Sequence, residues 1–272
     1  MRAREKNGFT LVELLVVISI IALLLAVLIP ALSRAKNLAR RVVCSAQIKD
    51  SQTAFLAYAS AEGEGKLPIG AMGAGTKPVP DYYMTGDGWS MLNYITEPTW
   101  LALTKYIKDT RTMICNSFAL TKDVRNDPAF KGSPYVPTGS TWNPPAYKLG
   151  YNYHGGHFAE KWPAPRSAAT KPWVSPYRIS DPGNLILFSD MITMSDNAYG
   201  TFIAHTPRGG ITGTVIGQDP MKLAPNGGGN IGKLDGSVSW KSIRDMERHH
   251  RAKNFGINYA VQPYTVTSFG YW

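Results

Sequence analysis

The stretch Gly8-Phe9-Thr10-Leu11-Val12-Glu13 decides how this chain folds. It ends a short polar leader and begins an apolar run whose sole charged residue is Glu13. An ionised acid inside a bilayer costs roughly 2.5–3.5 kcal/mol on insertion scales, so an acid at this position is a candidate for a functional role. The segment from Leu14 to Leu32 carries no charge, and its length is close to the ~20 residues that span a bilayer. We therefore expect one membrane-spanning helix near the N-terminus.

The motif KNGFTLVELLVVISIIALLLAVLIPAL resembles the signal of type IV prepilins and type II secretion pseudopilins. In that family a membrane peptidase cuts after the glycine and methylates the new N-terminal amine. The resemblance implies cleavage between Gly8 and Phe9, a role for Glu13 in assembly, and a stem that bends or locally melts at Pro30. The alternative is an ordinary signal anchor. A secretory leader is cut after its apolar run, whereas the cut-like site here precedes the run, so the anchor would stay on the mature protein.

Beyond Pro30 the apolar residues recur every three or four positions, with basic residues on the other face, which predicts an amphipathic continuation of the helix. Gly63, Gly65 and Pro68 should end it near Ala61. We expect an α+β fold of the type IV pilin kind, in which a long N-terminal helix packs on an antiparallel β-sheet head with long loops. The expected parts are a leader (1–8), a membrane-spanning or filament-core half (9–30), an amphipathic half (31–62) and a β-rich head (63–272).

Within the head, turn residues and apolar runs predict several elements. The segment 67–96 is rich in Gly, Pro and Tyr and is expected to be a loop, and 123–148 is expected to be a polar excursion. A short helix is expected over Trp100–Lys108. Strands are expected over Arg111–Cys115, Gly150–His154 and Leu185–Asp190. An Asp-Gly pair at 235–236 between alternating residues predicts a hairpin over Asn230–Trp240.

The passage from stem to head and several head segments resemble a large pseudopilin-like family that is abundant in planctomycetes and their relatives. The similar segments are RRVVCSAQIKDSQTAFLAYASAEGEGKLP, WLALTKYIKDTRTMIC, GYNYH, DPGNLILFSD and GGGNIGKLDGSVSW. That family is named for a histidine followed ten positions later by Asp-Gly. Asp235-Gly236 supplies the pair, but Pro225 stands at the histidine position, and His205 is too far upstream. The resemblance therefore carries over no role tied to that histidine, and the hairpin, which is kept, is interpreted as structural.

Composition limits the function classes. The 272 residues carry a formal net charge of +10, of which the leader holds two units, so the mature chain is about +8. A basic surface attracts nucleic acid or anionic lipid, but the Lys and Arg residues are scattered, and we do not expect nucleic-acid binding. The two cysteines, Cys44 and Cys115, could form a disulfide in an exported head, closing a loop worth roughly 4 kcal/mol. Two buried free thiols are the alternative.

Other candidate sites are weaker. His154 and His157 could offer imidazoles to a metal, but no third ligand has a recognisable spacing. Asp190, Asp196 and Asn197 could help to hold calcium, although solvated turn acids are the simpler interpretation. Cys44 has no evident histidine partner, and no G-x-S-x-G motif is present. His249-His250-Arg251 is interpreted as an exposed polar turn. We assign no catalytic residue, no metal ligand and no cofactor, and we keep calcium as an alternative.

The favoured function is therefore structural: a pilin or pseudopilin of a type IV pilus or type II secretion-like filament. The expected partners are prepilin peptidase, an inner-membrane assembly platform, and other copies of the chain or other pilins. The expected location is a single-pass bacterial inner-membrane protein with an exported head, and after assembly a periplasmic or cell-surface filament. The alternatives are a membrane-anchored binding or priming protein that does not polymerise and, more distantly, a membrane-anchored hydrolase. A pilus, a secretion pseudopilus and a DNA-uptake filament all fit the sequence.

Overall fold

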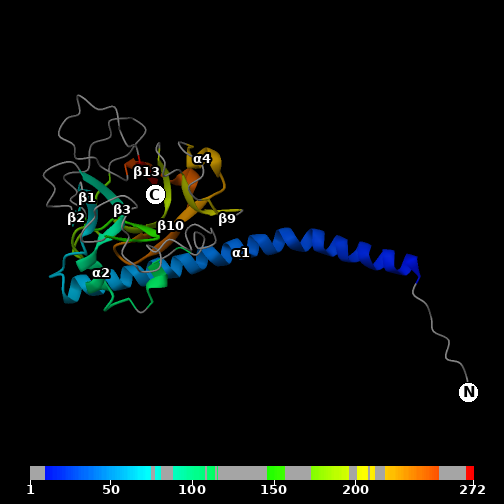
Figure 1. The fold of residues 1–272 in the computed structure, drawn as a ribbon, viewed down its shortest axis with the longest axis horizontal. Helices are drawn as coiled ribbons and strands as arrows, with labels where there is room; N and C mark the ends of the chain where they lie inside the picture. The colour runs from blue at the N-terminus through cyan, green and yellow to red at the C-terminus, as the bar shows by residue number, and fades with distance from the viewer. Residues whose placement is uncertain are drawn as a thin grey trace, which may run out of the picture.

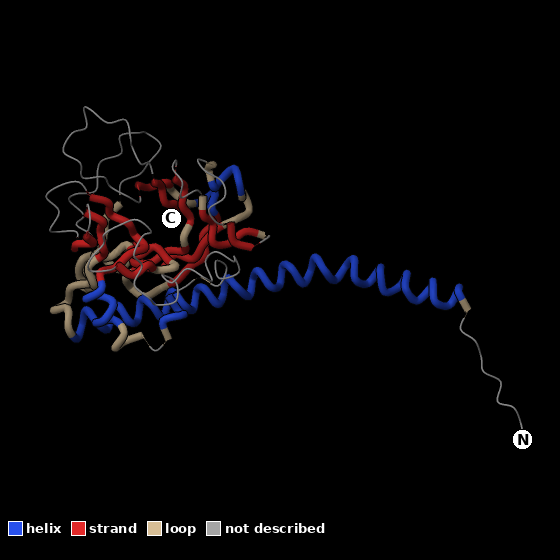
Figure 2. The backbone as a smooth tube through the Cα atoms, viewed as in Figure 1, coloured by secondary structure: helices blue, strands red, loops and turns tan. Residues whose placement is uncertain are grey.

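A single long helix, α1 (Leu11–Ala61), runs along one side of a β-rich head and projects far beyond it in this computed structural model (Figure 1). Strands are the main regular elements of the described head, with short helices at its margins (Figure 2). The architecture is the predicted α+β, type IV pilin-like one. The structure describes residues 10–74, 77–80, 88–107, 109–113, 115, 146–156, 173–195, 201–207, 209–211, 218–250 and 268–272.

The stem α1 is one uninterrupted helix of 51 residues. Thr10 caps its start, because the Thr10 side chain accepts a hydrogen bond from the backbone N–H of Glu13. Pro30 lies inside the helix, where a proline removes one backbone hydrogen bond, yet the helix continues through it. The stem is curved between its free end and the head (Figure 1). It ends at Ala61, close to Gly65, which adopts a φ of 77°, so the predicted end is confirmed.

The described residues of the head form two antiparallel sheets. The smaller one has the strand order β2-β1-β3-β4, and the larger one the order β12-β13-β7-β8-β10-β6-β5, with β11 beside β10 and β9 beside β8. The strands of the smaller sheet are β1 (Gly70–Ala74), β2 (Lys77–Pro80), β3 (Gly88–Thr96) and β4 (Ala146–Lys148). Those of the larger sheet are β5 (Tyr151–Tyr153), β6 (Ile186–Asp190), β7 (Ile192–Ser195), β8 (Phe202–Thr206), β9 (Gly209–Ile211), β10 (Gly228–Lys233), β11 (Val238–Ser242), β12 (Arg248–His250) and β13 (Ser268–Tyr271). Short helices are α2 (Glu97–Leu103), α4 (Pro220–Leu223), and the 3-10 turns η2 (Thr110–Met113) and η5 (Ile243–Asp245).

The C-terminal half of α1 packs on the larger sheet, against β10, β11, β6 and β8. Phe55 anchors this contact, with ring centroids 4.6 Å from Tyr153 and 4.9 Å from Phe188 in edge-to-face arrangements. The buried stem residues form one stripe: Cys44, Ile48, Ser51, Gln52, Ala54, Phe55 and Ala59. A side chain at Gly232 would put its Cβ 2.7 Å from atoms of Ile48 and Gln52, so a glycine is needed where β10 meets the helix.

A second buried cluster lies away from the stem, around Trp272, Ile192 and Ile243. His249 belongs beside it, since its ring stacks on Trp272 with centroids 4.5 Å apart and only 4% of the residue is exposed. The expectation of an exposed turn at His249 is therefore wrong. β12 pairs with β13, and this pairing places His249 in the interior of the head. The sequence around His249 contains no Gly or Pro that would favour a turn instead.

Several predicted elements are confirmed. β5 and β6 lie within the two segments where strands were expected. β10 and β11 form the expected hairpin around Gly236, which has a φ of 82°. The expected helix over Trp100–Lys108 exists as α2, but it begins at Glu97 and ends at Leu103.

Two other predictions are wrong. The segment 67–96 is not a loop, because it contains β1, β2 and β3. These strands pair through their backbone groups, and the amino-acid composition of the segment does not predict that pairing. β2 tolerates its prolines because it is the edge strand of its sheet. The segment Arg111–Cys115 is not a strand. It begins in η2, where the N–H and hydroxyl of Thr112 both donate to the carbonyl of Asp109 and close a turn. Of the expected excursion, only β4 lies within the described residues.

Candidate functional site: the stem helix and its junction with the head

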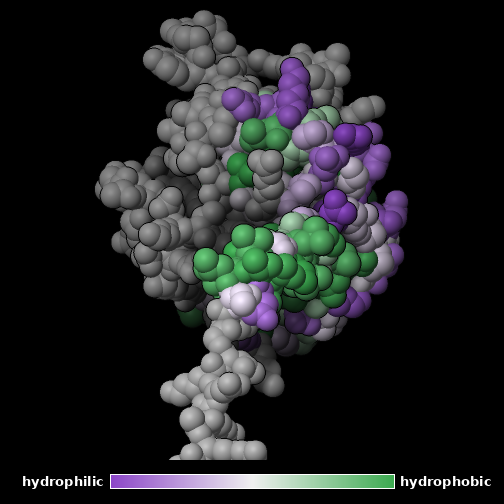
Figure 3. Space-filling view, turned by 90° about the vertical axis from the view of Figure 1, so that its right-hand side faces the viewer, coloured by the Kyte–Doolittle hydropathy of each residue, from purple (hydrophilic) through white to green (hydrophobic). Residues whose placement is uncertain are grey.

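The N-terminal half of α1 is an uncovered apolar surface. Every Leu, Ile and Val between Leu11 and Leu32 exposes at least 46% of its surface. Viewed from the side on which the stem projects, the hydrophobic residues gather on this helix, while polar residues cover much of the described head (Figure 3). By length and composition this is the one helix among the described residues that could cross a membrane. Soluble monomers rarely expose an apolar surface of this extent, and such a surface is typical of a membrane or protein contact.

Glu13 closes the first turn of this apolar helix. Its Oε2 atom accepts hydrogen bonds from the backbone N–H of Thr10 at 2.8 Å and from the Thr10 hydroxyl at 2.7 Å. The Thr10 hydroxyl in turn accepts from the N–H of Glu13 at 3.2 Å, which completes a capping box. The carboxylate therefore sits at the positive end of the helix dipole, where it is favoured. Sequence reasoning identified the acid but not the capping role of Thr10.

Polar contacts begin where α1 reaches the head. The Asn37 amide donates to the carbonyl of Pro207, and Arg40 donates to the Asn37 carbonyl oxygen at 3.2 Å. The Arg41 guanidinium lies 3.9 Å from the centroid of the Trp240 ring, a cation–π contact. Further along, the Gln52 amide donates to the carbonyl of Lys233 at 2.6 Å. These contacts fix both the position and the rotation of the helix against the sheet.

The two cysteines meet at this junction. Cys44, on α1, and Cys115, just after η2, are both fully buried, and their sulfurs lie 3.1 Å apart without a disulfide bond. The sequence placed them 71 residues apart, and the structure brings them together as a disulfide or a shared ligand would require. The disulfide itself stays a prediction.

Two buried residues that the sequence analysis did not connect with the cysteines lie beside these thiols. Asp190, at the end of β6, accepts from His205 Nε2, on β8, at 3.2 Å, and Cys115 lies 3.8 Å from the same nitrogen. The expectation that Asp190 is a solvated turn acid is wrong, as is the expectation that Cys44 has no histidine partner, because Cys44 also interacts with His205. No spacing in the sequence could have grouped these four residues, since they come from four separate segments.

The thiols and the imidazole alter one another's protonation. The hydrogen bond with Cys115 lowers the pKa of Cys44 to about 6, although burial opposes this shift. Burial acts to lower the pKa of His205, but the charge and hydrogen bond of Asp190 outweigh it and raise that pKa to about 9. The pKa shifts of Cys44 and His205 therefore favour the ionised thiol and the protonated imidazole.

The remaining predicted site residues lie elsewhere. His154 is buried in the core, where its Nε2 lies 2.9 Å from the hydroxyl of Ser189, away from the cysteines. His157, Asp196 and Asn197 lie outside the described residues, as do Gly8 and Phe9. Calcium binding in the head and cleavage at Gly8 therefore stay predictions.

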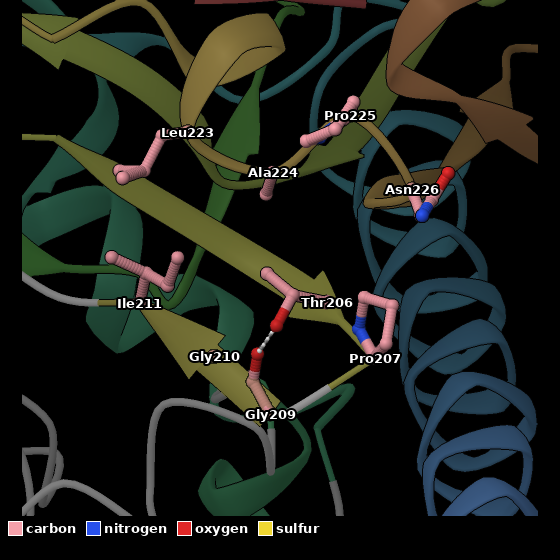
Figure 4. Close-up of a pocket in the computed structure, with 9 residues that line it drawn as sticks. All are labelled: Thr206, Pro207, Gly209, Gly210, Ile211, Leu223, Ala224, Pro225 and Asn226. Carbon is pink, nitrogen blue, oxygen red and sulfur yellow. Dashed lines mark hydrogen bonds between the residues drawn. The ribbon is translucent and has the colours of Figure 1, made fainter.

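A pocket of about 430 Å³ opens beside β8 and β9 (Figure 4). One of its lining residues, Pro207, accepts the hydrogen bond from Asn37 of α1. The Thr206 hydroxyl donates to the carbonyl of Gly209 at one wall (Figure 4). Pro225, which stands where the second family would have its histidine, lines the opposite side. The lining residues are Thr206, Pro207, Gly209, Gly210, Ile211, Leu223, Ala224, Pro225 and Asn226.

Comparison with known proteins supports the interpretation of the stem. Residues 3–29 match the prokaryotic N-terminal methylation motif. The chain is type IV pilin-like. Over 48 residues it is 52% identical to the type IV wide pilus major component PilA4 of Thermus thermophilus. The matched region covers 18% of this pilin-like chain and 37% of the length of PilA4. No solved structure matches it. The motif match stops at residue 29, so the resemblance of the head to the second family stays a prediction.

Proposed function

We propose that this chain is a structural subunit of a type IV pilus or a type II secretion-like filament. The observation that carries the proposal is the apolar N-terminal half of α1, which nothing in the described head covers. Before assembly, the inner membrane would cover it, with the head exported. After prepilin peptidase cuts behind Gly8 and methylates Phe9, an assembly platform would transfer the stem from lipid into a bundle of other stems. The head is proposed to belong to the planctomycete-type pseudopilin family.

Glu13 gives such a bundle its register. Thr10 occupies one oxygen of the carboxylate, and the whole side chain is exposed on the isolated chain. In a stem bundle it would pair with the Phe9 ammonium of a neighbouring copy. The pair contributes to assembly mainly because it avoids two unpaired charges in a low-dielectric environment. Misaligned stems are therefore disfavoured more strongly than aligned stems are stabilised. Pro30 would let the stem bend as it enters the bundle.

The test measures filaments made by the full-length chain in its own cells. Filaments sheared from cells that carry Glu13→Ala should be absent, while membrane insertion and cleavage continue. Asp50→Ala is the matched control, because Asp50 is an exposed acid on the same helix but lies outside the apolar half. Antibodies to the head should detect filaments from the wild type and from the control only. Normal filaments from cleaved Glu13→Ala protein would contradict the role of Glu13, and wild-type cells without filaments would contradict the proposal as a whole.

A second candidate, a membrane-anchored binding or priming protein, is favoured by the pocket beside β8 and β9. Its lining is largely apolar, and it lies near the point where the stem leaves the head. In that case the wild-type chain would be cleaved and exported but would stay in the membrane fraction. No catalytic role is proposed for the head.

A further inference from the structure

The buried junction between stem and head contains a group of four potential metal ligands. Cys44, Cys115, Asp190 and His205 each offer one ligand atom, and these atoms all lie within 4.8 Å of one another. Each residue is at most 3% exposed. The ligands come from α1, from the segment after η2, from β6 and from β8, so the group joins the stem to three parts of the head.

The spacing is close to that of a tetrahedral zinc site but tighter. Zinc bonds of about 2.0–2.3 Å to sulfur, nitrogen and oxygen place neighbouring ligand atoms roughly 3.3–3.8 Å apart. The two cysteine sulfurs are 3.1 Å apart, Cys115 Sγ is 3.8 Å from His205 Nε2, and that nitrogen is 3.2 Å from Asp190 Oδ2. Small shifts of side chains would open this group around a central ion.

The arrangement does not suit a cysteine–histidine–aspartate catalytic triad. In a triad the carboxylate holds one imidazole nitrogen while the nucleophile uses the other. Here Asp190 and Cys115 both approach Nε2 of His205. The ligand atoms of Asp190, Cys115 and His205 instead lie close together, as the ligands of a shared ion do, and the burial of all four residues leaves no open position for a substrate.

The surroundings also favour a bound cation. Asp190 Oδ2 accepts hydrogen bonds from the backbone N–H of Asn230 at 2.6 Å and from its amide at 2.9 Å, which orients the carboxylate. The other oxygen, Oδ1, is buried without a hydrogen-bond partner among the described groups. Gly229 makes room for this acid, because a Cβ there would lie 2.8 Å from the Cβ of Asp190. The buried Oδ1 atom is costly to leave unpaired, and a bound cation would give it a partner.

We propose that Cys44, Cys115, Asp190 and His205 bind one structural zinc ion that fastens the stem to the head. On binding, both cysteines are thiolates and His205 is neutral, so the protons they lose go to solvent. Two thiolates and one carboxylate balance the ion's charge to within one unit. The site uses the same two thiols as the predicted disulfide, so zinc binding and the disulfide exclude each other. The site does not depend on filament assembly.

The experiment uses the full-length chain in detergent, purified without a metal-binding tag and with thiols kept reduced. Elemental analysis should find one zinc per chain. Replacing zinc with cobalt should produce the visible absorption of a tetrahedral site and a thiolate-to-cobalt charge-transfer band. Cys44→Ser and His205→Asn should lose both signals. His249→Asn is the matched control, because His249 is an equally buried histidine outside the group and its loss should leave one zinc bound.

A thermal melt supplies the second measurement. A chelator should lower the melting temperature of the wild type and of His249→Asn but should not change that of Cys44→Ser. If the variants fail to fold, the cobalt spectrum of the wild type alone decides whether the proposed metal site exists. A reduced, folded wild type that takes up neither zinc nor cobalt overturns the proposal. Protein taken from cells with its thiols blocked that carries a Cys44–Cys115 disulfide and no metal would also overturn it.

Discussion

The two halves of α1 form one unbroken helix, yet they meet opposite surroundings. From Leu11 to Leu32 the apolar side chains are exposed all around the helix, whereas from Cys44 to Ala59 a single stripe is buried against the sheet. The first half is apolar on every face and the second on one face. The difference shows that the described part of the head supplies a partner for the second half only. It agrees with the proposal that lipid or other stems cover the first half.

The largest effect should come from preventing release of the first half from its leader. Gly8→Val should block cleavage, because a bulky residue obstructs a protease subsite that accepts only a hydrogen as side chain. Filaments should then be lost completely while the protein accumulates in the membrane. Mass spectrometry of the N-terminus checks this prediction. A mature protein that starts downstream of Ala31 would show instead that the segment is an ordinary cleaved signal.

The next largest effect should come from the packed half. Phe55→Ala removes the ring that contacts Tyr153 and Phe188, and should destabilise the folded head by about 3–5 kcal/mol. Leu23→Ala is its counterpart in the exposed half and should leave head stability unchanged, because Leu23 contacts solvent rather than the head. Denaturant unfolding followed by tryptophan fluorescence compares the two. Equal losses would mean that the halves are not independent.

The contrast between the halves was predictable from sequence, but the junction was not. The spacing of the apolar residues and the positions of the charges predict where the helix starts and where it becomes amphipathic. Gly63 and Gly65 predict where it ends. All of these are local properties of the sequence. Asp190 and His205 illustrate the failure. Each has an ordinary sequence context, and only the pairing of β6, β8 and β10 brings them to Cys44. The strands over 70–96 were missed for a similar reason, since backbone pairing with distant segments outweighed a loop-like composition.

A smaller effect is expected where the helix presses on the sheet. Gly232→Ala would place a methyl group 2.7 Å from atoms of Ile48 and Gln52 and should cost about 1–3 kcal/mol. The cost should shrink when Ile48→Ala removes one of the clashing groups, which a double-mutant cycle measures. If the two changes add without coupling, α1 and β10 do not approach each other this closely.

The smallest effect concerns the far end of the packed half. Glu62 accepts hydrogen bonds from Lys105 at 2.9 Å and from Tyr106 at 3.0 Å, which lower its pKa below the usual 4.5. A carboxyl whose pKa is lower in the folded state adds stability above its unfolded pKa and loses it as the pH falls. Glu62→Gln should therefore lower stability slightly at neutral pH and flatten the acid-induced decline below about pH 4.5.

Unfolding curves between pH 3 and pH 7 test this, with Asp50→Asn as the control from an exposed site on the same helix. An identical pH profile for Glu62→Gln and the wild type would show that the Lys105 contact has no influence on stability.

The position of Cys44 has a mechanical consequence. Cys44 is the first fully buried residue of α1, about 50 Å along the helix from Leu11 at 1.5 Å per residue. A pulling force on the free end is transmitted along the exposed first part of α1, which contacts nothing else in the described chain. The force reaches the head around Asn37 and Cys44. The first bonds to bear that load are therefore the polar contacts at the junction and the group of Cys44, Cys115, Asp190 and His205. Phe55 and the aromatic core behind them remain shielded until those bonds yield.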